Sequence, residues 1–313
     1  MVQYTYLDIN TKDFELLTCT SSIIPGYFYL KLILLNKHNH FSFTERLYIL
    51  KMLKYFFPVV FLISCNSKIL ITRKPNTSTS GSAFYKEAAG LQWKQRDSLA
   101  MHYILSGHIP AFLNKMQPVN FIFHNNGKRY RVTYFVSSDY LSVGTDDDWA
   151  RIPLTPMFSQ KIADSLDCFL PTTKMVNDIH EHATIKLAPI PLVENRDNSN
   201  TMYQHHLLIQ EQYKNQKGII SGIKKDIVIT DQLNNKPDRV AIYGWYKLNG
   251  KPIQPLYTGH VNWYADYSHG TRLIYKKIRI NGKWFEHSTV FKDPVLRKIL
   301  TNEATSDFLK YKY

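Results

Sequence analysis

The stretch V-N-F-I-F-H-N-N-G-K-R-Y-R-V-T-Y-F-V, residues 119–136, decides the fold of this chain. β-Branched and aromatic residues lie on both sides of Asn126-Gly127, a dipeptide typical of the two-residue turn between antiparallel strands. The stretch therefore predicts a β-hairpin with strands at 119–123 and 130–136. A second pair, Asn281-Gly282 within K-I-R-I-N-G-K-W-F, predicts another hairpin near the C-terminus.

The segments around these hairpins alternate between helical and extended patterns. Apolar residues at helical spacing predict helices at 83–116, 155–166, 172–183 and 202–216, and short closing helices in D-P-V-L-R-K-I-L and T-S-D-F-L-K-Y. Further strands are expected at 141–143 and in I-V-I-T, R-V-A-I-Y-G-W-Y and T-R-L-I-Y-K-K-I-R-I. Strands before and after a helical middle indicate an α+β fold, a single mixed domain with antiparallel strands over 83–313.

A polar segment and a short apolar run precede that domain. Residues 66–82 include K-P-N-T-S-T-S-G-S, which predicts a tether with little apolar surface to bury. Before it lies M-L-K-Y-F-F-P-V-V-F-L-I-S-C, residues 52–65, where Lys54 precedes about nine apolar residues. This length suits the core of a signal peptide and is too short for a membrane-spanning helix. A buried strand or helix is the alternative, and Pro58 disfavours both.

The end of this run, Leu62-Ile63-Ser64-Cys65, resembles the lipobox of bacterial lipoproteins. The resemblance implies that Cys65 is lipidated, that the mature chain is anchored to a membrane in the cell envelope, and that residues 1–51 are an upstream extension. The other interpretation is a membrane anchor over 47–64, in which Lys51 and Lys54 are unfavourable.

Charge and cysteine content limit the classes of function. The chain has 39 Lys and Arg against 25 Asp and Glu, and the part after residue 65 keeps a balance of about +12. Such a balance favours an anionic neighbour, and export argues against nucleic acid as a partner. If Cys65 is acylated in a chain that starts at Met52, Cys168 is the only remaining thiol, which excludes a disulfide framework.

The densest candidate site is Q-P-L-Y-T-G-H-V-N-W-Y-A-D-Y-S-H-G-T-R, residues 254–272. We assign catalytic roles to His260, Asp266, His269 and Arg272, because a carboxylate beside an imidazole supports acid–base chemistry. His269 would be the acid or base and Asp266 its orienting partner. Aromatic side chains here suit sugar rings, so the predicted substrate-binding residues are Gln254, Trp263, Tyr264 and Tyr267, together with Lys225 and Asp226 at the start of another strand.

Two further resemblances concern this region. Ser268-His269-Gly270-Thr271-Arg272-Leu273 is similar to the S-H-G-C-x-R-L motif of L,D-transpeptidases, with Thr271 in the position of the nucleophilic Cys and one residue missing before the Arg. A threonine hydroxyl is a far weaker nucleophile than a thiol without a strong adjacent base. The stretches S-G-H-I-P-A-F-L, S-S-D-Y-L-S-V-G-T-D-D-D, L-P-T-T-K-M-V, I-Y-G-W and D-Y-S-H-G-T-R-L lie within residues 97–280. Through them this part of the chain resembles a group of exported bacterial proteins without an established activity.

Other candidate sites have weaker patterns. Asp139 with the run Asp146-Asp147-Asp148 lacks EF-hand spacing and suits helix capping, and neither His180-x-His182 nor His205-His206 has the helical zinc spacing. Cys168 falls at the end of an apolar helix, which is a core-like position for a thiol. We therefore predict no metal and no cofactor.

The sequence favours an extracytoplasmic hydrolase or transferase that acts on cell-wall or other extracellular glycan or peptide material. A non-catalytic lipoprotein that binds glycan or protein through the same loop is the alternative.

Overall fold

The computed structural model describes residues 14–24, 27–36, 79–214 and 216–313. The chain divides into two compact units, Met1–Asn66 and Ser67–Tyr313. In the first unit, strands β1 (Phe14–Ile24) and β2 (Tyr27–Asn36) form an antiparallel pair. This pair lies within residues 1–51, a stretch that the sequence predicts to lie outside the domain.

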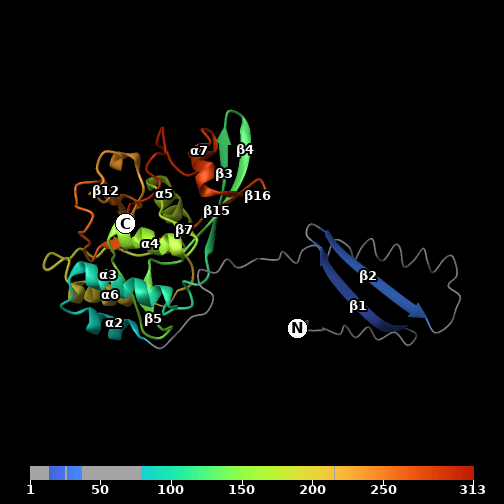
Figure 1. The fold of residues 1–313 in the computed structure, drawn as a ribbon, viewed down its shortest axis with the longest axis horizontal. Helices are drawn as coiled ribbons and strands as arrows, with labels where there is room; N and C mark the ends of the chain where they lie inside the picture. The colour runs from blue at the N-terminus through green and yellow to red at the C-terminus, as the bar shows by residue number, and fades with distance from the viewer. Residues whose placement is uncertain (1–13, 25–26, 37–78, 215) are drawn as a thin grey trace. The chain divides into compact units, whose positions relative to one another are not determined.

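The second unit is a mixed α+β domain, as the sequence predicts (Figure 1). In its described residues the α-helices are α2 (Gly81–Ala88), α3 (Trp93–Leu105), α4 (Pro156–Ser165), α5 (Thr173–His182), α6 (Ser199–Tyr213) and α7 (His287–Lys292), and the 3-10 helices are η1 (Asp231–Leu233) and η2 (Leu296–Ile299). Residues 80–82 of the predicted tether form the N-cap and first residues of α2.

The larger sheet contains both predicted hairpins. Its strand order is β16-β15-β4-β14-β7, with β3 on the other edge of β4. Asn126 and Gly127 both have positive φ, as do Asn281 and Gly282, because the tight turns of β3–β4 and β15–β16 require it. The strands are β3 (Gln117–Asn125), β4 (Lys128–Val136), β7 (Cys168–Phe169), β14 (Ile274–Tyr275), β15 (Lys277–Ile280) and β16 (Lys283–Glu286).

A smaller sheet has the order β12-β11-β10-β13 and carries the candidate site. Its strands are β10 (Lys225–Ile227), β11 (Ile242–Tyr246), β12 (Pro252–Tyr257) and β13 (His269–Gly270), and β10 runs parallel to β13. Two short pairs complete the described strands: antiparallel β5 (Ser142–Gly144) with β6 (Trp149–Arg151), and parallel β8 (Ile185–Lys186) with β9 (Ile220–Ser221).

Several expected elements differ from the structure, among them the strand predicted in I-V-I-T, residues 227–230, of which only Ile227 belongs to β10. The helix predicted over 83–116 is two helices, because the chain turns at Gly90, whose φ is +79°, and the second of them ends at Leu105, so 106–116 is not helical. The single strand predicted over 271–280 is divided into two strands, β14 and β15. The segment T-S-D-F-L-K-Y is not helical, because its backbone amides at Asp307 and Phe308 donate to the Asp231 carboxylate instead.

One large apolar core joins both sheets to the helices, and a smaller cluster lies around Tyr140, Ile185 and Ile223. Burial of each large aliphatic or aromatic side chain contributes about 1.5–3 kcal/mol to folding. In Figure 1 the β3–β4 hairpin extends away from α2, α3 and α6, which gather at the other side of the domain. The candidate site lies on β10 and β13 of the smaller sheet.

Candidate functional site

The parallel pairing of β10 with β13 brings the two predicted site segments together. Lys225 is opposite His269 and Asp226 is opposite Gly270, and the Lys225 amide donates to the Ser268 carbonyl over 2.7 Å. Because side chains alternate along a strand, Lys225 and His269 share one side of the sheet and Asp226 lies on the other. The site therefore has two sides, each with its own charged groups.

Asp266 is the anchor of the first side. Its buried carboxylate accepts hydrogen bonds from the Ser268 amide (2.9 Å), from the Ser268 hydroxyl and from Arg196 (2.9 Å). Burial acts to raise the pKa of Asp266, but His269, Ser268 and Lys225 hold it well below the usual range. Asp266 is therefore an anion at neutral pH.

His269 lies beside this carboxylate and is completely closed to solvent. Its Nε2 atom is 3.9 Å from Asp266 Oδ1, too far for a hydrogen bond, and neither ring nitrogen has a hydrogen-bond partner among the described residues. Burial lowers the pKa of His269 to about 4, so the ring is neutral at pH 7. The structure thus places the predicted acid or base where an external substrate does not reach it directly.

His260 is the imidazole of this site that is only half-buried. Its ring centroid lies 4.8 Å from that of Tyr264 and 6.1 Å from that of His269. Burial and the cation of Lys225 lower the pKa of His260, while the Asp266 carboxylate acts in the opposite direction. A neutral imidazole under the influence of a carboxylate can act as a general base.

Lys225 completes the first side together with a strained tryptophan. Its ammonium lies 5.0 Å from the centroid of the Trp245 ring, and burial lowers the pKa of Lys225. Trp245 has a φ of +59°, a conformation that is rare for a bulky residue, and its indole N–H has no hydrogen-bond partner among the described residues. Backbone strain of this kind gathers at functional sites.

The second side contains a buried ion pair built on Asp226. Tyr140 donates to Asp226 Oδ2 over 2.8 Å, and Arg272 Nε lies 3.7 Å from Oδ1. Burial raises the pKa of Asp226 to about 6, although Arg272 and Tyr140 favour its charged form. The Arg272 guanidinium also stacks on the Tyr140 ring at 4.1 Å and donates to the Ser137 carbonyl, so it serves the interior of the fold.

A chain of buried polar groups continues this second side, and sequence reasoning missed it. Lys224 contacts His205 Nδ1 at 3.1 Å and donates to the Tyr267 carbonyl, and burial lowers its pKa to about 7. Arg151, fully buried, is paired with Asp139 at 2.6 Å. The signal available was the Lys-Lys-Asp run at the start of β10, in which all three charged side chains, Lys224, Lys225 and Asp226, are buried.

The aromatic residues of the loop have different surroundings. Trp263, 52% exposed, and Tyr264 line a pocket of about 330 Å³ together with Trp93, Arg96 and other residues of 90–93 and 197–199. The Tyr264 hydroxyl also contacts Asp266 at 3.4 Å and so connects the pocket to the charged site. Tyr267 is instead buried and hydrogen-bonded to the Leu192 backbone.

Buried polar atoms without hydrogen-bond partners are concentrated at this site. Among the described residues, most of them are on Arg196, His205, Asp226, Trp245, His269 and Arg272, and the others are on Tyr134, Arg297 and Ser306. Packed interiors pair nearly all such groups, and exceptions gather where a fold has a functional role. The electrostatics therefore mark this site as different from ordinary core.

Several predicted residues lie elsewhere or serve the fold. Gln254 is on the edge strand β12 and donates to the neighbouring Pro255 carbonyl. Thr271, which the transpeptidase motif places at the nucleophile, is buried and bonded to the Ser159 hydroxyl at 2.6 Å. Cys168 is buried in the core, where burial raises its pKa.

The acidic run and the histidine pairs act within the fold. Asp146 accepts from the Ala111 amide, and Asp148 accepts from the Ser82 amide at the start of α2. His180 stacks on Tyr246, and His182 contacts the Asn120 carbonyl at 2.8 Å. In 79–214 and 216–313, no group of three or more acidic, histidine or cysteine side chains is arranged to hold a metal ion.

Comparison with models of protein families, with curated proteins and with solved structures found no match. Within the described part of the chain, no helix has the length and apolar character needed to cross a membrane. The signal-like run at 52–65, including Cys65, lies outside the described residues.

Proposed function

We propose that the chain is a lipid-anchored protein of the bacterial cell envelope, and that its domain is a hydrolase or transferase for cell-wall or other extracellular glycan or peptide material. One observation carries the proposal: His260, half-buried and neutral, packs against Tyr264, which lines the pocket and contacts the buried Asp266 carboxylate. An accessible base backed by a buried anion is suited to activating a water or hydroxyl group.

In this proposal His260, not His269, takes the proton. The complete burial of His269 argues against its direct contact with substrate. As His260 becomes an imidazolium, the Asp266 carboxylate stabilises the new positive charge, and Lys225 supplies a cation for charge that develops on the substrate oxygen. His269 holds its place beside Asp266 as a positioning residue.

The pocket supports a substrate that contains sugar rings. Trp93 and Trp263 supply aromatic rings for the apolar faces of a pyranose, and the exposed Gln92 and Asp197 line the same pocket with hydrogen-bonding groups. Its volume of about 330 Å³ is in the range of small-molecule sites and suits one or two rings of a polymer.

The test measures turnover of purified peptidoglycan and its soluble fragments, with products identified by mass spectrometry. We expect His260→Ala to lower the rate by about 10²–10⁴-fold, the usual contribution of a general base. His124→Ala, a substitution of an exposed histidine on β3, is the matched control and should leave the rate unchanged. Full turnover in His260→Ala would remove this site from the proposal.

A non-catalytic glycan- or protein-binding lipoprotein is the second candidate, and the burial of His269 together with the exposure of Trp263 favours it. In that case the wild-type chain has no turnover, Trp263→Ala weakens sedimentation with insoluble peptidoglycan, and His260→Ala does not.

The anchor has its own test. Expressed in a bacterium fed radiolabelled palmitate, the wild-type chain should become labelled and begin at Cys65, and Cys65→Ser should not be labelled. Labelling of the variant would contradict the anchor but not the site.

A further inference from the structure

The outward face of strands β3, β4, β15 and β16 carries arginines without acidic partners. Opposite residues in an antiparallel ladder share a face. In the ladder, Arg131 is opposite Ile122, and Arg279 is opposite both Thr133 and Trp284. At the end of the hairpin, Arg129 is opposite His124. All of these side chains therefore lie on one surface of the sheet. We call Arg129, Arg131, Arg279, Ile122 and Trp284 the arginine face.

The charges of this face are not neutralised within the fold. No carboxylate of the described residues lies within 4 Å of Arg129, Arg131 or Arg279, whereas Lys277 on the same sheet is paired with Glu286 at 3.9 Å. Arg279 contacts only neutral groups, with Nη2 donating to Thr133 Oγ1 at 3.4 Å and the guanidinium 5.8 Å from the Trp284 ring. The face is thus an uncompensated basic surface.

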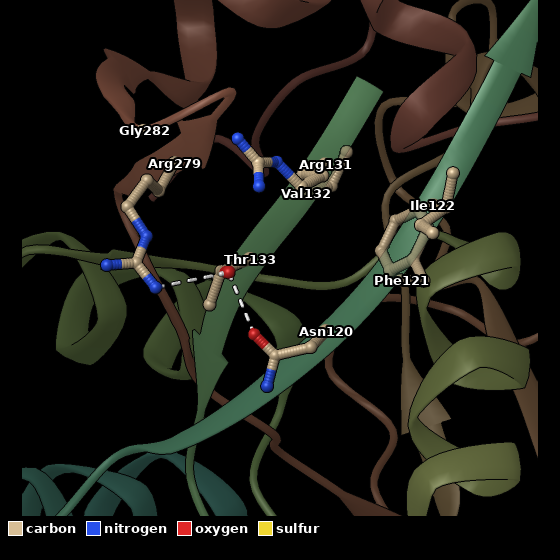
Figure 2. Close-up of a pocket in the computed structure, with 8 residues that line it drawn as sticks. All are labelled: Asn120, Phe121, Ile122, Arg131, Val132, Thr133, Arg279 and Gly282. Atoms are coloured by element: carbon tan, nitrogen blue, oxygen red, sulfur yellow. Dashed lines mark hydrogen bonds between the residues drawn. The ribbon is translucent and has the colours of Figure 1, made fainter. Parts of the chain in front are cut away.

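A groove of about 450 Å³ lies between Arg131 and Arg279 (Figure 2). Asn120 and Thr133 line it, and Thr133 donates to Asn120 Oδ1 over 2.8 Å, which fixes both side chains. Residues diagonal to one another on adjacent strands are about 7–8 Å apart, so two guanidinium groups can approach one phosphate from opposite sides.

Exposed apolar side chains lie beside the arginines on the same face of the sheet. Ile122 is 45% exposed beside Arg131, and Trp284 is 44% exposed beside Arg279, with its ring stacked on Phe135. Tryptophan favours the interface between water and lipid, and arginine keeps its charge at the headgroups while its stem contacts apolar groups. Exposed apolar side chains next to unpaired arginines are therefore better suited to contact with lipid headgroups than to contact with water alone.

From this geometry we infer that the arginine face binds a bilayer surface containing anionic phospholipids, with a lipid phosphate held between Arg131 and Arg279. Ile122 and Trp284 then enter the headgroup region. This binding does not depend on acylation of Cys65 or on the site at β10 and β13.

Single-stranded nucleic acid is the other polyanion that such a face suggests, and the aromatic residues disfavour it. Binding of successive bases needs several exposed rings along a basic groove. Two aromatic rings lie on this face, and Phe135 is partly covered because it stacks on Trp284. Trp284 is therefore the ring of this pair that is exposed to solvent. A lipid surface needs no ladder of rings.

The experiment uses the full chain with Cys65→Ser, so that no acyl chain contributes to affinity. We expect it to sediment with vesicles of phosphatidylglycerol and phosphatidylcholine but not with vesicles of phosphatidylcholine alone, and to be released by salt. Arg131→Gln or Arg279→Gln should each lower the partition coefficient about fivefold, and both together about thirtyfold. Ile122→Asn should lower it further if the face enters the headgroup region.

The matched control removes two charges elsewhere, with Lys94→Gln on α3 and Lys247→Gln between β11 and β12, both exposed. It should change partitioning less than twofold, and thermal unfolding should show that every variant remains folded. Equal loss in this control, equal binding to phosphatidylcholine vesicles, or tighter binding of a single-stranded oligonucleotide through Arg131 and Arg279 would overturn the inference. Vesicle binding is measured without peptidoglycan turnover, so failure of this inference can be distinguished from failure of the proposed function.

Discussion

The Nε2 atom of His269 lies 3.9 Å from Oδ1 of Asp266, and both side chains are buried. The two side chains are close enough to influence each other's charge but do not share a hydrogen bond. As a result the pair contains a fixed anion and a neutral ring at pH 7, and protonation of that ring is unfavourable until the solution is strongly acidic.

We predict that the domain loses stability in acid because of its buried histidines. The pKa is lowered to about 4 in His180 and His269 and to about 2 in His205 and His206, in each case chiefly by burial. Below about pH 6.5 the unfolded chain binds protons on these rings and the folded chain does not, so the free energy of unfolding falls as the pH falls. Asp226, whose raised pKa favours the folded state in acid, partly opposes this.

The measurement is urea unfolding at about pH 7.5 and about pH 5. A histidine with a folded pKa near 4 contributes about 2 kcal/mol to the loss at pH 5, so His269→Asn should reduce the loss by that amount and the exposed His124→Asn should not. A stability that is equal at both pH values would contradict the prediction.

Gly270→Ala should destabilise the domain by about 1–3 kcal/mol through overpacking. A Cβ at this position would lie 2.4 Å from Tyr140 Cδ1 and 2.8 Å from Lys224 Cβ, and both neighbours are buried. Gly90→Asn is the control, because a Cβ there meets no atom within 4 Å and asparagine tolerates positive φ. Thermal unfolding compares the two, and an equal effect would show that crowding at Tyr140 is unimportant.

Asp139→Asn should cost about 3–5 kcal/mol, because it leaves the buried guanidinium of Arg151 without its counter-ion. The equivalent change at Asp167, whose ion pair with Lys276 is at the surface, should cost less than about 1 kcal/mol. Urea unfolding midpoints, with unchanged slopes, give both values. A loss below 1 kcal/mol in Asp139→Asn would mean that the pair is not closed to solvent.

Cys168 should resist alkylation in the native protein. Burial raises the pKa of its thiol, and Sγ donates to the Leu166 carbonyl at 3.2 Å, so the reactive thiolate is disfavoured. Modification by iodoacetamide, followed by peptide mapping, should be at least about a hundredfold slower than in denaturant, since exposure requires unfolding that costs several kcal/mol. Rapid native modification would contradict the structure around Cys168.

The sequence predicted local structure well and long-range pairing poorly. Asn126-Gly127 and Asn281-Gly282 identify both hairpins because their turns require positive φ, a purely local property. The contact between Lys225 and His269 joins segments more than 40 residues apart and has no local signal. The interior polar groups Lys224 and Arg151 were missed because charged residues are rarely buried unless they are paired.

The parallel pairing of β10 with β13 has a consequence for how the chain folds. Parallel strands need a long connection, and here the segment from β10 to β13 includes the whole β11–β12 hairpin. Closing such a loop costs entropy before its contacts form, so we expect the strand that carries His269 to join the sheet after the hairpins have formed. Protection of the Lys225 amide from hydrogen exchange, whose acceptor is the Ser268 carbonyl, should therefore appear later in refolding than protection within β3 and β4. The site would then be complete only when the rest of the domain is already in place.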